Sequence, residues 1–340
     1  MRPTVQISIR EHAGFLAVAS LCILPLSGPR AQTDGDTIAS RLAELRSGLR
    51  SRPGGVLGLM GYNATPDGSA NAVTVDRSRV TGGIGDRTLT LGQLGSGFTV
   101  SESFPLFLEG YLGYARYDPR AVFSGGEEQR LTPLRWNNVV GTVGVGYDIR
   151  LGEYLWLRPI LNASLGYAAS DASLFGDFVK YKTGVDISVF RDIHMNVWGL
   201  GGSMVLAYYD YRPKRDIDVE LRYTQIRLET FGDTLPQARG SSTAQAVGLW
   251  TRLRWPTGLE AFGRPVRWVI DGSASTYLGD QRDALGFSWS AKIGGGIEFD
   301  VGRYEMGGMG LYLSRVRFLG RYFFADRNIT GVSFGIGMSF

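Results

Sequence analysis

The sequence has little cysteine and histidine: one Cys and two His among 340 residues. Cys22 and His12 both lie in an N-terminal segment with the pattern of a secretory signal, so processing would leave His194 as the one remaining imidazole. The mature chain would then lack disulfides, thiol chemistry and any Cys or multi-His metal site. We expect no cofactor, no metal site and no catalytic residues.

The signal segment spans residues 1–31. Arg2 and Arg10 supply positive charge, Ala13–Leu26 is apolar, and small residues follow before Gln32. The apolar stretch is too short and too interrupted by proline to be a membrane-spanning helix, but it has the length typical of a signal peptide. The pattern predicts export, and a mature chain without cysteine suits an oxidising compartment.

The chain also lacks a strong charge bias and long apolar runs. Lys and Arg number 36 against 32 Asp and Glu, a formal net charge of +4, spread evenly along the sequence. This balance argues against nucleic acid as a partner. No run of 18 apolar residues follows the signal, so the sequence predicts no transmembrane helix in the mature chain.

One segment has helical periodicity. Within Asp36–Arg52, apolar side chains recur at helical spacing, at Ile38, Leu42, Leu45 and Leu49. Pro53, Gly54 and Gly55 follow, and we expect them to end the helix. Residues 33–53 are therefore predicted to form a linker that carries one helix, the only helix that the sequence indicates.

From Gly55 onward the polarity alternates with a period of two residues, the pattern of β-strands. In the last segment, Val332, Phe334, Ile336, Met338 and Phe340 alternate with Gly and Ser. About twelve such segments are expected in the barrel region, residues 54–340: one within 55–80, then 87–100, 105–117, 136–151, 155–169, 196–211, 216–230, 245–255, 266–278, 287–301, 309–325 and 330–340.

A soluble β-sandwich would alternate as well. Three features favour a membrane barrel: the polar face is rich in Gly and Ser, the chain stops on an alternating strand, and aromatic residues gather near segment ends, as interface girdles require. We expect an all-β fold: a transmembrane antiparallel β-barrel of about 12 strands in the bacterial outer membrane, surrounded by lipid and monomeric. The girdle residues expected are Tyr114, Tyr117, Tyr154, Trp156, Tyr208, Tyr209, Tyr211, Trp250, Trp255, Tyr322 and Phe323.

The face that would line the lumen carries both signs of charge. Such a lining could favour anions in an open pore, or it could be a salt-bridged interior that grips a plug. We favour the second interpretation, because opposite charges are interspersed and a helix is available to fill the lumen. The predicted lumen charges are Arg158, Arg222, Arg252, Arg254, Arg267, Arg315, Arg317, Arg321, Glu109, Glu220, Asp271 and Glu298.

The signal, the single helix before the strands, the twelve alternating segments and the terminal Phe340 together resemble the translocator domain of autotransporters (type V secretion). The resemblance covers residues 36–340 and implies that the helix leads through the pore into the first strand. It also implies that the barrel-assembly machinery reads the C-terminal signal, here Phe334, Ile336, Met338 and Phe340. Unlike the family, this chain has only a few residues between the signal and the helix, so it resembles a passenger-less form.

The sequence is consistent with three functions. The chain could be a plugged barrel with a structural or interaction role, or a porin-like channel for small solutes. It could also be an outer-membrane enzyme, but barrel hydrolases need a histidine with a Ser or Asp partner, and we expect His194 to be an ordinary residue of the barrel rim.

Overall fold

The computed structural model describes one compact unit of the chain, within Leu45–Phe340. The ranges described are 53–67, 72–80, 87–117, 136–170, 181–182, 194–234, 239–261, 263–285, 287–302, 307–308, 311–312, 314–326 and 329–339. The predicted signal, the predicted helix with Ile38, Leu42, Leu45 and Leu49, and Phe340 lie outside the described residues.

Long strands dominate the described chain. They run from β1 (Ala72–Val80) and β2 (Arg87–Thr99) through β3 (Leu106–Tyr117), β4 (Trp136–Tyr147), β5 (Ile149–Arg150), β6 (Leu155–Ser170), β7 (His194–Arg212), β8 (Arg215–Phe231), β9 (Ser241–Ala261), β10 (Arg264–Leu278), β11 (Trp289–Asp300), β12 (Gly307–Gly308), β13 (Leu311–Tyr312) and β14 (Arg315–Ala325) to β15 (Ile329–Ser339). Most match the predicted segments within a few residues, because the alternation marks each strand directly. The expected segment 309–325 is split, since β12 and β13 form a separate two-stranded sheet.

The strands close into a ring. β1 pairs antiparallel with both β2 and β15, β4 pairs with both β3 and β6, and each strand between them pairs with its neighbours. The short β5 follows β4 after Asp148 and pairs with β6. Counted over the described residues, twelve long strands complete the barrel, which confirms the predicted fold class. Closure gives every one of these strands two partners, the condition for crossing hydrocarbon with strands.

The alternation sorts side chains between two faces. Large apolar side chains point outward and are exposed, such as Leu161 at 74%, Leu165 at 65% and Val143 at 62%. Their neighbours in sequence, such as Asn162, Ser164 and Thr142, point inward and are buried. In water such an exterior would be unstable, whereas in a bilayer it faces lipid. The chain is therefore an outer-membrane-type β-barrel.

In the described part of the chain two complete helices accompany the barrel, and neither was predicted from the sequence. Helix α3 spans Pro53–Ala64 and α7 spans Gly279–Leu285. Pro53, Gly54 and Gly55, which we expected to end the predicted helix, form the first turn of α3 instead. The end of the predicted helix before them lies outside the described residues. Proline fits the first helical position, where its missing N–H is not needed. The barrel also starts later than Gly54, since α3 precedes β1.

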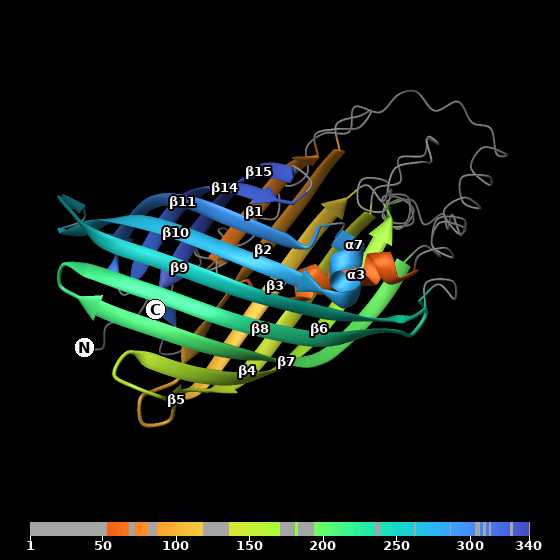
Figure 1. The fold of residues 1–340 in the computed structure, drawn as a ribbon, viewed down its shortest axis with the longest axis horizontal. Coiled ribbons are helices and arrows are strands. Elements are labelled where there is room, and N and C mark those ends of the chain that lie inside the picture. Colours follow the sequence, from red (N-terminus) through yellow and green to blue (C-terminus); the bar gives the residue numbers. More distant parts are fainter. Residues whose placement is uncertain are drawn as a thin grey trace, which may run out of the picture. The chain divides into compact units, whose positions relative to one another are not determined.

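The two ends of the barrel differ. At the end that we call the helix end, α7 connects β10 to β11, and α3 packs against α7 (Figure 1). At the opposite end, the turn end, β7 is joined to β8 through residues 213–214 and β9 to β10 through residues 262–263. β15 ends and β1 begins at the turn end, since Ala72 pairs with Gly337.

Candidate functional site: the interior of the barrel

Helix α3 lies inside the barrel near the helix end. Its side chains Val56, Leu57, Leu59 and Met60 are at most 3% exposed. The helix has no charged residue and contacts β3, β4, β6, β8, β9 and α7. Apolar residues that surround a whole helix need walls on every side, and here the barrel strands provide them.

Glycines allow the close approach of the two helices. A Cβ atom at Gly58 of α3 would overlap the Cβ of Ala284 in α7, and one at Gly61 would lie 2.9 Å from the Cβ of Ala244 in β9. In α7, Gln281, Ala284 and Leu285 are buried. The two helices and the wall thus form one packed layer at the helix end.

Polar contacts hold the C-terminal end of α3 and the residues after it. Asn63 donates a hydrogen bond to Asn138, and the Thr142 hydroxyl donates to the carbonyl of Ala64 at 2.9 Å. Gln93 accepts from the amide of Asp67 and donates to the carbonyl of Thr65, at 2.9 and 3.0 Å. The bond from Thr142 satisfies the Ala64 carbonyl, a backbone group at the helix terminus without a partner within the helix. Gln93 holds the backbone of Thr65 and Asp67, just after the helix.

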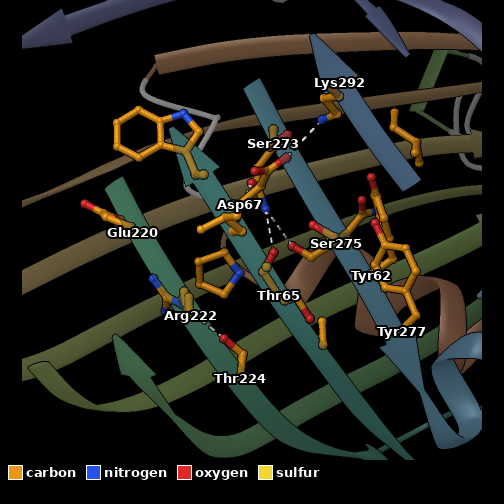
Figure 2. Close-up of a pocket in the computed structure, with 18 of the residues that line it drawn as sticks. Tyr62, Thr65, Asp67, Glu220, Arg222, Thr224, Ser273, Ser275, Tyr277 and Lys292 are labelled. Atoms are coloured by element: carbon orange, nitrogen blue, oxygen red, sulfur yellow. Dashed lines mark hydrogen bonds and ion pairs between the residues drawn. The ribbon is translucent and has the colours of Figure 1, made fainter. Parts of the chain in front are cut away.

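An ion pair fixes the chain where it leaves the helix. Nζ of Lys292 in β11 lies 2.9 Å from Oδ2 of Asp67, and the Lys292 side chain is only 4% exposed (Figure 2). Since Gln93 and Lys292 come from different strands, they hold Asp67 from two parts of the wall.

A cavity of about 70 Å³ remains between this segment and the wall (Figure 2). Its lining mixes side chains from the segment with side chains from β8, β10 and β11, among them Thr65, Glu220, Ser275 and Lys292. Ligand pockets usually measure ~300–1,000 Å³. The cavity therefore suits a few water molecules better than a solute of metabolite size.

A buried polar network on the inner face of the barrel joins side chains of β3, β6, β7 and β8. Arg222 makes a bidentate pair with Glu109, at 2.7 and 2.9 Å, and also donates to Ser203 at 2.8 Å. Asn162 donates to Glu109 at 2.7 Å and accepts from Ser203. Each polar group has a partner of matching chemistry, as a buried network requires.

A second network, rich in guanidinium groups, lies between β8 and β14. Asp271, 0% exposed, accepts from Arg252 at 2.8 Å, from Arg321 at 2.6 Å and from the Trp250 indole at 3.1 Å. The network continues toward the turn end through the carboxylates of Asp216, Asp218 and Glu298, which pair with Arg254, Arg267, Arg315 and Arg317.

The structure places the twelve predicted lumen charges on the inner face, and it brings them together in pairs. Ten of them belong to the two networks. Arg158 pairs with Asp148 and lies 3.8 Å from the centre of the Phe107 ring. Glu220 accepts from the Tyr209 hydroxyl. None of these placements tests whether the lining acts on a solute.

Sequence reasoning missed several interior groups. The predicted lumen charges did not include Asp216, Asp218 and Lys292. Each of them stands an even number of residues from Glu220 or Glu298 on the same strand, so its odd or even position (its parity) could have placed it on the inner face. The same odd–even rule also corrects several expected girdle residues. Trp250 and Phe323, 6% and 2% exposed, point inward, and the part-buried Trp156 and Tyr209 pack against an interior apolar cluster. Trp250 has the same parity as Arg252, which was the available signal.

His194 begins β7 at the helix end. Its Nε2 lies 3.5 Å from Oδ1 of Asp233, which is 84% exposed, and its ring stacks on Tyr167. The pKa of Asp233 is lowered, first by a hydrogen bond from its own backbone amide and then by His194. Within the described residues no group of three His, Cys, Asp or Glu side chains could hold a metal ion. Nor does the described chain contain a helix long and apolar enough to cross a membrane.

Three of the four residues expected to form the assembly signal lie on β15, which pairs with β1 and β14, and the fourth, Phe340, lies outside the described residues. Phe334, Ile336 and Met338 point outward and are 65%, 40% and 37% exposed. Their role in assembly stays a prediction.

Comparison with known proteins finds no matching family model and no matching curated protein. Among solved structures, the barrel resembles the β domain of the Bordetella autotransporter BrkA (14% identity, TM-score 0.44, 79% of this chain and 97% of that one). It also resembles the transport unit of AIDA-I from Escherichia coli (13%, 0.42, 85% and 99%) and the translocator domain of NalP from Neisseria meningitidis (13%, 0.40, 78% and 85%). These likenesses concern the fold alone, and the strand pairing described above defines that fold independently of them.

Proposed function

We propose that this protein is a plugged outer-membrane barrel with a structural or interaction role, closed at the helix end by its own helices α3 and α7. The observation that carries the proposal is the burial of α3. Leu57 and Met60 are both 0% exposed, and the helix contacts β3, β4, β6, β8 and β9. A helix enclosed in this way occupies the cross-section through which a solute would pass.

The orientation follows from the lengths of the connections. Barrels of this type have short periplasmic turns and longer extracellular loops. The short connections 213–214 and 262–263 lie at the turn end, whereas β3–β4 and β6–β7 are joined at the helix end through residues 118–135 and 171–193. We infer that the turn end faces the periplasm. The helix end, with α7 and the longer connections, is then the surface available to a partner outside the cell.

The test is conductance in planar bilayers. The intact barrel is expected to conduct little, and deletion of Pro53–Ala64 is expected to raise the single-channel conductance. Gly58→Leu should act in the same direction, because its side chain would displace α3 from Ala284. Gly110→Leu is the matched control: a Cβ atom there meets nothing within 4 Å, so the conductance should stay unchanged.

The porin-like channel is the second candidate, and the arginine-rich wall near the turn end favours it. The two candidates differ in the intact protein. If the intact barrel conducts like an open pore, and neither the deletion nor Gly58→Leu changes the conductance, the plug proposal fails and the channel replaces it. Hydrolysis that His194→Ala abolishes would instead establish an enzyme.

A further inference from the structure

The outer face of the barrel carries a group of polar side chains on β8 and β9. The outward positions of β8 toward the helix end are Gln225, Arg227 and Glu229. The outward Gln245 of β9 pairs with Gln225. We call these four residues the polar patch. Strands of membrane barrels keep apolar side chains on the face toward lipid, so the polar patch needs an explanation that lipid alone does not provide.

Strand pairing places part of the polar patch inside the apolar belt of the barrel. Glu229 pairs with Trp198 of β7, and Gln225 pairs with Gly202 of the same strand. Trp198 points outward, is 41% exposed, and is an aromatic residue of the kind that marks the membrane interface. At about 3.3 Å per residue and a strand tilt of about 40°, the step from Trp198 to Gly202 covers a depth of roughly 10 Å. Gln225 therefore faces hydrocarbon, whereas Glu229 lies at the interface.

The two glutamines of the polar patch leave hydrogen-bonding groups without a partner. Oε1 of Gln225 accepts from the hydroxyl of Tyr223 at 2.7 Å and from Nε2 of Gln245 at 3.1 Å. Within the described chain no group accepts from Nε2 of Gln225, and none donates to Oε1 of Gln245. Acyl chains contain neither donors nor acceptors, so lipid leaves both groups unsatisfied at a cost in free energy.

The two unsatisfied groups are complementary to each other across a two-fold axis. An axis along the membrane normal sets each residue opposite residues of similar depth in a second copy. Gln225 of one copy can then donate to Gln245 of the second copy, and symmetry forms the same bond a second time. Arg227 and Glu229, which pair at 2.8 Å within one copy, give the patch one charge of each sign. Two copies of the patch therefore meet without net repulsion.

A groove beside the polar patch gives room for a close approach. It measures about 770 Å³ and lies on the outer wall over β4, β6 and β7, with Gln225 and Arg227 at one edge. Its lining includes Gly202, and small residues let surfaces approach closely in membrane interfaces. Under the two-fold axis this groove faces β9 of the second copy. The outward Val247 and Leu249 of that strand, 36% and 43% exposed, can enter the groove.

We propose that the polar patch and the adjoining groove form an interface at which two copies of this barrel associate in the membrane. The occupant is a second copy, in place of the monomer expected from the sequence. The interface lies on the outer wall, so association does not require α3 to leave the lumen.

The test is sedimentation equilibrium of the intact mature barrel in density-matched detergent micelles. A reversible equilibrium between monomer and dimer is expected. Gln225→Leu keeps the outer face apolar and removes an amide that the dimer uses twice. The variant should raise the dissociation constant of the dimer about tenfold or more, because two hydrogen bonds within the membrane are lost.

Asn137→Leu is the matched control for Gln225→Leu. Asn137 is an outward amide on β4, and it accepts from the hydroxyl of Tyr114 at 2.9 Å as Gln225 accepts from Tyr223. It lies outside the polar patch, so the control should dimerise as the unmodified barrel does. Heat-modifiable migration on gels shows whether each variant is folded.

Cysteine cross-linking in lipid vesicles tests the same interface if Gln225→Leu does not fold. With an added oxidant, a mixture of Gln225→Cys and Gln245→Cys barrels should form disulfide-linked dimers, since a disulfide needs close Cα atoms. Leu94→Cys is the control, because Leu94 is 44% exposed on β2, five strands from β8 around the ring.

Four results would overturn the proposal. They are a monomer at every protein concentration, an unchanged dissociation constant in Gln225→Leu, an equal loss in Asn137→Leu, and cross-linking of Leu94→Cys as strong as that of the patch. A monomer that retains phospholipid on purification would assign the groove to lipid instead.

Discussion

The two halves of the barrel interior are filled by different means. At the helix end, α3, which has no charged residue, packs against the wall and against α7, whose buried residues are Gln281, Ala284 and Leu285, with glycines of α3 at the closest contacts. Toward the turn end, β8 to β14 bring together ionised side chains that form ion pairs with one another. Packing in the first half depends on shape, whereas the second half depends on the pairing of charges. A substitution should therefore have a different effect in each half.

The largest effect is expected in the charged half. Asp271→Asn leaves the buried Arg252 and Arg321 without their shared carboxylate, and breaking such a pair costs about 3–5 kcal/mol. The measurement is the free energy of unfolding in urea, with the barrel in lipid vesicles. Asp300→Asn is the control. Its pair with Arg264 is long, at 3.9 Å, and part-exposed, so a loss below about 1 kcal/mol is expected. Similar losses at both sites would contradict the role given to the buried network.

In the packed half, Leu57→Ala should cost about 2–5 kcal/mol, the range for truncating a buried leucine. Leu57 is 0% exposed, and Leu112 on the outer face is 49% exposed, so Leu112→Ala should cost less. The same urea titration measures both. If Leu57→Ala matches Leu112→Ala in stability, α3 does not share a core with the barrel.

Substitutions on the outer face of the barrel should respond to the surrounding lipid or detergent, whereas substitutions in the interior should not. Val145 points outward and is 52% exposed. Val145→Arg should cost about 2–4 kcal/mol if the site lies near the bilayer midplane. Gly144→Ala, one residue away, tests the interior instead, because its Cβ would lie 2.6 Å from side-chain atoms of Glu109 and Asn162. In detergent of increasing headgroup charge, the cost of Val145→Arg should change while that of Gly144→Ala should not. Parallel changes would contradict the assignment of the two faces.

The smallest effect is expected at the rim. The pKa of Asp233 is lowered from its ordinary value of 3.8, so its contribution to stability is present above that value and is lost as the pH falls through the folded-state pKa. Asp233→Asn should remove this small acid dependence and leave the melting temperature near pH 7 almost unchanged, since the carboxylate is exposed. Melting curves recorded from about pH 2 to about pH 7 provide the measurement. A large loss of melting temperature at neutral pH in Asp233→Asn would contradict the placement of Asp233 at the exposed rim.

The strands and the charged half could largely be read from the sequence. Alternation marks strand bounds directly, and parity assigns faces, so Arg252 and Arg254 were placed on the inner face without a structure. Where parity was not applied, the prediction failed. Trp250 was expected in an outer girdle because it lies near a segment end, yet it shares the face of Arg252 and donates to Asp271.

The packed half could not be read in the same way. Helix α3 contains four glycines after Pro53 and has no polar face, so it shows neither an amphipathic stripe nor the charged caps that mark a helix. Its stability comes from enclosure by strands that are distant in sequence, such as β3 and β9. Helix α7 is short, and its buried residues are explained by the contact with α3.

The sequence by itself determined the barrel, because a two-residue polarity period assigns each side chain to lipid or lumen one residue at a time. Only the tertiary structure decided what fills the lumen. The pairing of neighbouring strands brings the arginines of β9, β10 and β14 to shared carboxylates on β8, β10 and β11. Closure of the ring encloses a helix that has no solvent-facing side, and both outcomes depend on contacts between residues far apart in the chain.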